Sequence, residues 1–131
     1  MHKPFFAWVA MCCTAAVAQV LGAGGVAADF PPQAQTPSAA QLAERLNGHL
    51  FTARLANGTT WRIDYKSSSG YVFYDVSSGG RDTAKWRTED GRACFEFRGA
   101  FPSGCAEFRL IGDVLHFKRA STGEIVAMEK N

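Results

Sequence analysis

The chain has 131 residues, of which 47% are hydrophobic and 20% charged, and its formal net charge at pH 7 is +2. This length suits one small domain rather than several. A charge so close to neutral argues against a protein that binds nucleic acid or a membrane surface by electrostatic attraction alone.

The first 28 residues have the pattern of a signal peptide. Lys3 supplies a positive charge, residues 4–18 form an apolar run, and the segment closes on Val26-Ala27-Ala28. Small side chains at these positions suit signal peptidase, so cleavage is predicted after Ala28, with Ala18 as a second acceptable site. An uncleaved membrane anchor is the alternative, because apolar and small residues continue for about 25 positions. We expect cleavage, since the glycines near its end make this segment a poor helix, and hence a periplasmic or secreted protein.

Two of the four cysteines, Cys94 and Cys105, lie outside this segment. An even pair of cysteines in an oxidising compartment favours a disulfide. A zinc site would need further ligands, and no histidine lies close to them in the sequence. The sequence therefore predicts a Cys94–Cys105 disulfide and neither a metal nor a cofactor.

The predicted mature part has a proline-rich spacer, residues 29–37, and a single β domain, residues 38–131, which begins with a helix. Ser38 can cap this helix, and Gln41 stands where a capping box places its second member. The helix is predicted to run from Ala39 to Leu46.

From His49 onward apolar residues alternate with polar ones, and glycine-containing turns separate the alternating segments. Short segments at this spacing are typical of antiparallel strands joined in sequence. The prediction is an all-β fold, a small antiparallel up-and-down barrel or curled sheet of about eight strands with one short N-terminal helix. The predicted strands are 49–55, 59–66, 71–77, 81–87, 92–98, 104–110, 113–119 and 124–128.

Turn lengths fix the expected pairing of neighbouring strands. A two-residue turn at Gly99-Ala100 would place Cys94 directly opposite Cys105 on the outer face, close enough for a disulfide. The same reasoning, applied to three further hairpins, predicts the pairs Phe51–Ile63, Leu110–Leu115 and Trp86–Ala93, the last across a four-residue loop from Thr88 to Gly91.

On these registers the interior is rich in aromatic side chains. They either fill the core themselves or surround a narrow apolar pocket that the helix closes at one end. In the second case a few inward polar groups would orient a small ligand. The predicted ligand-binding residues are Trp61, Tyr65, Trp86, His49 and Asp82.

The segment 71–77 is apolar on both faces. Tyr71 and Phe73 fall on the outer face, where the N-terminal helix covers them or where they form an aromatic surface for a partner protein.

No catalytic constellation is recognisable in the sequence. Serines 67–69 have no histidine placed to activate them. The expected registers also separate Asp82, inward, from Glu96 and Glu107, outward, so a carboxylate pair for glycoside hydrolysis is not predicted. We therefore expect a protein that is not an enzyme.

The spacing Trp86-x4-Gly91-x2-Cys94, followed by Cys105 and a tight turn at Gly112, resembles small exported bacterial proteins of unknown function. The similarity spans roughly residues 61–123. It implies export, a disulfide and an all-β fold, and it carries over no catalytic residue. The periplasmic lysozyme inhibitors share only the architecture, because the local pattern around their first cysteine is missing here.

The leading hypothesis is an exported, non-enzymatic binding module of the cell envelope, for a small apolar or aromatic ligand or for a partner protein. One alternative is a protein inhibitor of an envelope-active hydrolase such as a lysozyme, which would use the loop at 67–70 or the loop at 77–80. A structural envelope protein without a ligand is the other.

Overall fold

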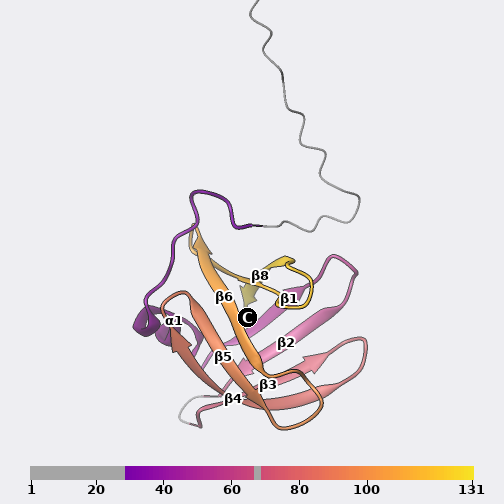
Figure 1. Cartoon of the computed structure of the whole chain (residues 1–131). Helices are drawn as coiled ribbons and strands as arrows, with labels where there is room; N and C mark the ends of the chain where they lie inside the picture. Colours follow the sequence, from indigo (N-terminus) through magenta and orange to yellow (C-terminus); the bar gives the residue numbers. More distant parts are fainter. Residues whose placement is uncertain (1–28, 67–68) are drawn as a thin grey trace, which may run out of the picture.

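The computed structural model describes residues 29–66 and 69–131 (Figure 1). The predicted signal peptide, residues 1–28, lies outside the described residues. Within the described part of the chain, no helix has the length and apolar character that a membrane span requires.

Eight antiparallel strands follow one another around a closed barrel, in which the last strand pairs with the first. Closure leaves no unpaired sheet edge. The prediction of a small up-and-down barrel is thus confirmed, and the curled open sheet is excluded. The elements are α1 (Ala39–Leu46), β1 (Leu50–Arg54), β2 (Thr60–Tyr65), β3 (Tyr71–Val76), β4 (Arg81–Glu89), β5 (Arg92–Phe97), β6 (Gly104–Ile111), β7 (Val114–Lys118) and β8 (Ile125–Lys130).

The helix α1 has its predicted bounds and its predicted capping box. The Ser38 hydroxyl accepts from the Gln41 backbone N–H (3.2 Å), and the Gln41 side-chain oxygen accepts from the Ser38 backbone N–H (3.0 Å). These bonds satisfy N–H groups that have no partner inside the helix. Leu42 and Leu46, one turn apart, are fully buried, and α1 packs against β4 and β5.

Hydrogen bonds to the β4–β5 hairpin determine where α1 lies. Its first backbone N–H, on Ala39, donates to Asp90 Oδ1 (2.8 Å), and the Thr88 hydroxyl donates to the Ala39 carbonyl (2.8 Å). The expectation that α1 would cover Tyr71 and Phe73 is therefore wrong, and Phe73 keeps 43% of its surface exposed.

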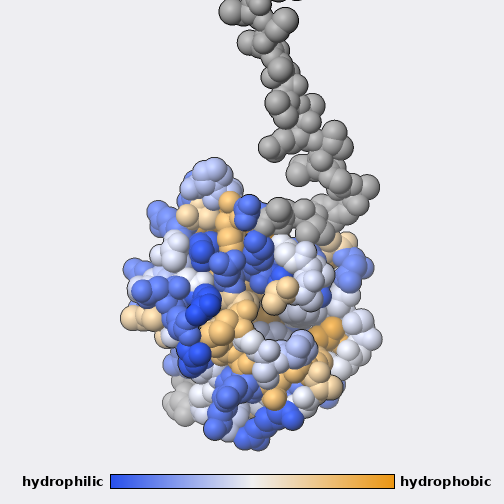
Figure 2. Space-filling model, in the orientation of Figure 1, coloured by the Kyte–Doolittle hydropathy of each residue, from blue (hydrophilic) through white to orange (hydrophobic). Residues whose placement is uncertain are grey.

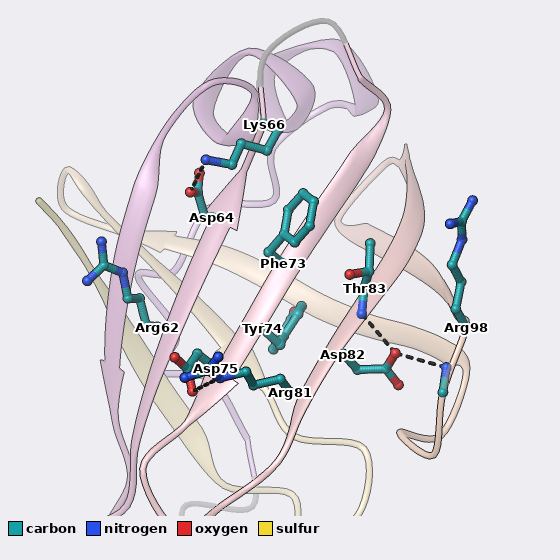
Figure 3. A pocket seen from close by; sticks show the side chains of 11 residues that line it. Arg62, Asp64, Lys66, Phe73, Tyr74, Asp75, Arg81, Asp82, Thr83 and Arg98 are labelled. Atoms are coloured by element: carbon teal, nitrogen blue, oxygen red, sulfur yellow. Dashed lines mark hydrogen bonds and ion pairs between the residues drawn. The ribbon is translucent and has the colours of Figure 1, made fainter.

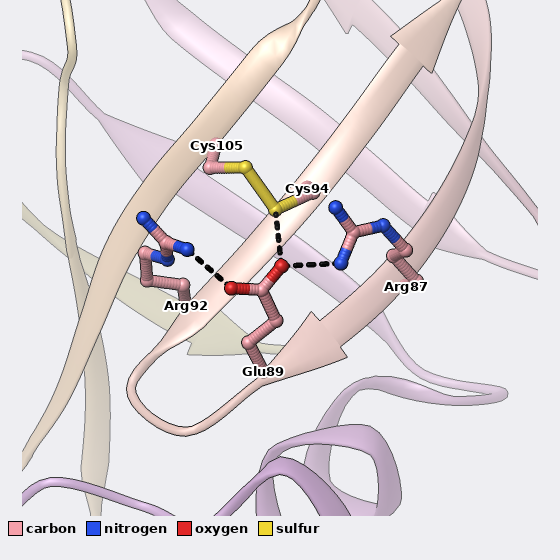
Figure 4. The surroundings of a disulfide bond; sticks show 5 residues. All are labelled: Arg87, Glu89, Arg92, Cys94 and Cys105. Atoms are coloured by element: carbon pink, nitrogen blue, oxygen red, sulfur yellow. Dashed lines mark hydrogen bonds and ion pairs between the residues drawn. A yellow bond between two sulfur atoms is a disulfide. The ribbon is translucent and has the colours of Figure 1, made fainter.

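The disulfide between Cys94 and Cys105 is present, as predicted (Figure 4). The two residues lie directly opposite each other on β5 and β6, with their Cα atoms 3.9 Å apart. Along the same ladder Phe108 N–H donates to the Gly91 carbonyl (2.8 Å). Because hydrogen-bonded and non-hydrogen-bonded pairs alternate, the cysteines occupy a non-hydrogen-bonded pair, where side chains approach most closely.

Three of the four predicted strand registers are confirmed, and one is wrong. Trp86 lies opposite Phe95, not Ala93, because the β4–β5 connection is a two-residue turn at Asp90-Gly91. Asp-Gly is among the favoured two-residue hairpin turns. The shift of two positions leaves every side chain on its expected face. The confirmed pairs are Phe51–Ile63, Leu110–Leu115 and Cys94–Cys105.

Aromatic side chains pack together in the half of the barrel next to α1. Tyr65 is fully buried and meets the ring of Trp86 edge-on, with centroids 4.9 Å apart. The Tyr65 hydroxyl and the Trp86 indole N–H are both buried and make no hydrogen bond with the described residues. Aromatic packing thus occupies this part of the interior, while a depression of about 550 Å³ beside α1 reaches the side chains of Phe51, Leu115 and Met128.

Contacts with β6 hold the segment that precedes the helix. Gln35 and Leu110 exchange two backbone hydrogen bonds of 2.8 Å, so Gln35 adds a short bridge beside β6. The ring of Phe30 lies under the Arg109 guanidinium, whose central carbon is 5.2 Å from the ring centroid. Part of the predicted spacer therefore packs against the barrel wall.

Candidate functional site

The barrel is hollow at the end away from α1. A cavity of about 440 Å³ opens there between the β1–β2, β3–β4, β5–β6 and β7–β8 loops. On the face shown in Figure 2, hydrophobic residues gather around a hollow near the middle of the molecule. Most of the cavity wall is apolar, and its aromatic members are Trp61, Tyr74, Phe95, Phe97, Phe101, Phe108 and Phe117.

The aromatic rings of the wall pack on one another. Trp61 and Phe117 are stacked, with centroids 5.8 Å apart and an interplanar angle of 18°. Tyr74 meets Phe95 and Phe97 edge-on, at 6.0 and 5.2 Å. Stacked and edge-on contacts are the favourable arrangements of aromatic pairs, so the rings of the wall support one another.

Phe101 forms one lip of the cavity. It belongs to the β5–β6 loop, its ring lies 5.5 Å from that of Phe97, and a Cβ at Gly80 would lie 3.2 Å from it. The loop is therefore folded against the β3–β4 turn at the cavity entrance.

Asp82 holds the β5–β6 loop in this position. Its carboxylate accepts backbone N–H bonds from Gly99 (2.8 Å), Phe101 (3.0 Å) and Thr83 (2.8 Å). Desolvation raises the pKa of Asp82, but the three backbone N–H bonds favour the charged form more strongly, and the net effect is a pKa below the usual range. The carboxylate is thus used to shape the entrance, and it is not part of the cavity lining.

Among the described residues that line the cavity, only Arg119 has a charged side chain. Its guanidinium carbon lies 5.2 Å from the centroid of the Trp61 ring, in a cation–π arrangement. Its Nη1 donates to Glu124 Oε1 (3.3 Å), and the side chains of Arg119 and Glu124 are only 20% and 10% exposed. The rim of an otherwise apolar cavity therefore carries a fixed, largely buried ion pair.

The lining offers little for acid–base catalysis. Its one hydroxyl on an aromatic ring belongs to Tyr74, and burial raises the pKa of Tyr74 well above that of a free tyrosine. A general acid or base works best with a pKa near the operating pH, and the raised pKa of Tyr74 lies far above it.

Of the five predicted ligand-binding residues, the structure places only Trp61 in the cavity wall. Tyr65 and Trp86 lie in the packed half of the barrel. His49 borders a separate depression beside α1, and Asp82 holds the β5–β6 loop. The residues are therefore distributed over different parts of the barrel and do not form one site.

Arg119 and Glu124 were missed, although the alternation of their strands contains the signal. Arg119 continues the inward series Leu115, Phe117, and Glu124 begins the inward series that includes Val126. The two residues also face each other across the β7–β8 ladder, where Arg119 N–H donates to the Glu124 carbonyl (2.8 Å). Opposite charges at paired inward positions could have indicated a polar rim.

A shallow depression of about 720 Å³ lies on the outer face over β2, β3 and β4 (Figure 3). Phe73 projects from its centre, between the Asp64–Lys66 pair (2.8 Å) and the Asp75–Arg81 pair (3.5 Å). Positive and negative side chains surround Phe73 in similar numbers, so the depression has no strong electrostatic preference.

Tyr71, the second residue of the predicted partner surface, is partly covered. Arg98 Nη2 donates to the Tyr71 hydroxyl (2.6 Å), and its guanidinium carbon lies 4.6 Å from the ring centroid. The exposed aromatic surface on this face is therefore mainly that of Phe73.

The disulfide has a carboxylate beside it (Figure 4). Glu89, Cys94 and Cys105 place an oxygen and two sulfurs within 4.8 Å of one another. The sulfurs are bonded to each other, and Glu89 is paired with Arg92 and Arg87, which hold the pKa of its carboxyl below the usual range. All three side chains are thus already engaged with other groups.

These features define a small closed meander barrel, stapled by one cross-strand disulfide, with an aromatic cavity open at one end. No protein-family model matches the chain, and neither a curated protein nor a solved structure is significantly similar to it.

Proposed function

We propose that the mature protein is an exported, non-enzymatic binding module of the cell envelope, which holds a small apolar or aromatic ligand in the open end of its barrel. The cavity of about 440 Å³ carries this proposal. Pockets that bind small molecules typically measure about 300–1,000 Å³ and combine apolar walls with a few fixed polar groups.

The location of the cavity supports binding. The rigid strands position its walls, while loops form its entrance, as is common for ligand sites in barrels. Burying an apolar ligand against these rings would contribute roughly 25 cal/mol for each Å² of apolar surface removed from water. A ligand that fills the cavity would thus gain affinity without any covalent or acid–base chemistry.

Export remains a proposal based on the signal-peptide pattern and on the disulfide. A cross-strand disulfide persists in an oxidising compartment and is rare in the cytosol. We place the protein in the periplasm or the secreted fraction, with a mature chain that begins at Asp29.

Native mass spectrometry of the protein purified from the periplasm, without refolding, tests this proposal. We expect a chain that starts at Asp29, lacks the two hydrogens of the disulfide and carries an additional small-molecule mass that denaturation removes. A bare monomer that also fails to take up added decanol would contradict ligand binding.

A partner protein is the second candidate, and the exposure of Phe73 favours it. A benzyl side chain that is 43% exposed within a depression is a typical anchor at a protein interface. Phe73→Ser should abolish capture of such a partner, whereas Val114→Ser should not, although Val114 is equally exposed. Inhibition of a lysozyme that survives Phe73→Ser but is lost on changing Ser77–Gly80 would instead support the inhibitor alternative.

A further inference from the structure

We propose that Arg119 gives the cavity a preference for an apolar ligand that carries one carboxylate, an inference that rests on the proposed ligand-binding function. The position of Arg119 supports this proposal. Arg119 lies at the cavity rim, and its guanidinium lies over Trp61, which in turn stacks on Phe117. A ligand whose body lies along these rings would bring its polar end to Arg119.

The guanidinium has donors to spare. Only Nη1 is used, in the bond to Glu124. Nε is buried and out of reach of a ligand, whereas Nη2 is not among the buried atoms and forms no hydrogen bond with the described residues. Nη2 can therefore donate to a ligand carboxylate at the cavity rim.

The chemistry of the ligand's polar end decides how well it bonds to Nη2. A carboxylate accepts a charge-assisted hydrogen bond from the guanidinium, whereas an alcohol offers a neutral acceptor and a hydrocarbon offers none. The structure therefore favours a carboxylate over these alternatives.

Glu124 positions the arginine through Nη1 and does not occupy Nη2. Its second oxygen, Oε2, accepts from the Ala56 backbone N–H (2.8 Å), which ties the carboxylate to the β1–β2 loop. Glu124 offsets part of the arginine's charge, so the preference for an anionic ligand should be moderate. Among the described residues that line the cavity no other side chain is charged, so neither a second cation nor an anion of the wall alters this preference.

The probes for the test are decanoate and decanol, which share an alkyl chain and differ in charge. Isothermal titration calorimetry measures the affinity of each for the mature protein. We expect decanoate to bind about tenfold more tightly than decanol, the effect of one additional charge-assisted hydrogen bond.

The double variant Arg119→Gln/Glu124→Gln removes both charges together, so that no partner is left as an unpaired buried ion. Decanoate should then bind no more tightly than decanol. Arg109→Gln is the matched control, because Arg109 is similarly buried (22% exposed) and also lies on an aromatic ring, Phe30, but outside the cavity. This control should keep the preference for decanoate.

The outcomes separate the two proposals. If decanol binds but decanoate binds no better, or if the double variant keeps the preference, the role assigned to Arg119 is wrong and the ligand-binding function stands. If neither probe binds the wild type, both proposals fail for this class of ligand.

Discussion

The indole of Trp61 stacks on the ring of Phe117 at a centroid distance of 5.8 Å, although β2 and β7 are not neighbours in the barrel. This contact crosses the interior and forms part of the cavity wall. Trp61 thus contributes to both the folded state and the proposed binding surface, and these contributions can be measured separately.

Replacing Trp61 with phenylalanine is expected to lower the affinity for decanol several-fold, because the ligand loses part of an aromatic wall. The matched variant Trp86→Phe removes an indole from the packed half of the barrel and should leave the affinity for decanol unchanged. Both variants should lower the free energy of unfolding by about 1–3 kcal/mol, since each removes buried aromatic surface. Titration calorimetry and urea unfolding give the two quantities, and an equal loss of affinity in both variants would contradict the assigned cavity.

The variant Asp82→Asn is expected to destabilise the protein and to loosen the β5–β6 loop at the cavity entrance. An amide accepts backbone N–H bonds more weakly than a carboxylate and has no charge. Because the folded state lowers the pKa of Asp82, the carboxylate stabilises the fold above the ordinary aspartate pKa, and this contribution disappears as the pH falls through the lowered value.

The difference in unfolding free energy between wild type and Asp82→Asn should therefore be largest at neutral pH and shrink in acid. Urea unfolding at several pH values measures it. Asp75→Asn is the control, because Asp75 makes only an exposed ion pair with Arg81 and should show a smaller difference. A difference for Asp82→Asn that does not change with pH would contradict the role of its charge.

Reducing the disulfide should lower the free energy of unfolding by about 3 kcal/mol, the loop-closure estimate for cysteines 11 residues apart. The β5–β6 ladder contains only four residue pairs, so its stability depends on the disulfide more than that of a longer ladder would. Chemical unfolding with and without reductant measures the effect. The variant Cys94→Ala/Cys105→Ala should match the reduced wild type and should not respond to reductant.

The variant Gly91→Ala should destabilise the protein by about 2–3 kcal/mol, because it combines left-handed backbone strain with a steric conflict. Gly91 has a φ of +68°, and a Cβ there would lie 2.8 Å from both Arg109 Nη1 and the Thr36 methyl group. Gly112 has a similar φ, +61°, with nothing within 4 Å of an added Cβ. Gly112→Ala should therefore cost only about 1 kcal/mol, and thermal unfolding of the pair measures the difference.

The alternation of residues and the turn chemistry predicted most of the fold. The capping box at Ser38 and Gln41 is a local arrangement, and it defined α1 correctly. Cys94 lies opposite Cys105 as predicted, although residues 98–103 connect β5 and β6 in place of the predicted two-residue turn at Gly99-Ala100. The Leu110–Leu115 register does follow from a two-residue turn, at Gly112-Asp113, and registers of this kind are largely encoded by neighbouring residues. For the β4–β5 hairpin the prediction was a four-residue loop and the structure has a two-residue turn. Both connections are compatible with the local sequence, which therefore did not decide between them.

The tertiary structure decided where the cavity lies and which residues face it. Alternation shows that a side chain points inward, but the interior of the barrel includes a packed half with Tyr65 and an open half with Trp61. The position of α1 determines which end of the barrel is covered and which is open. This position depends on long-range hydrogen bonds such as that from the Ala39 N–H to Asp90. The contact of Arg119 with Trp61 likewise joins strands that do not pair. Such contacts depend on the closure and curvature of the whole barrel, which no local sequence pattern specifies.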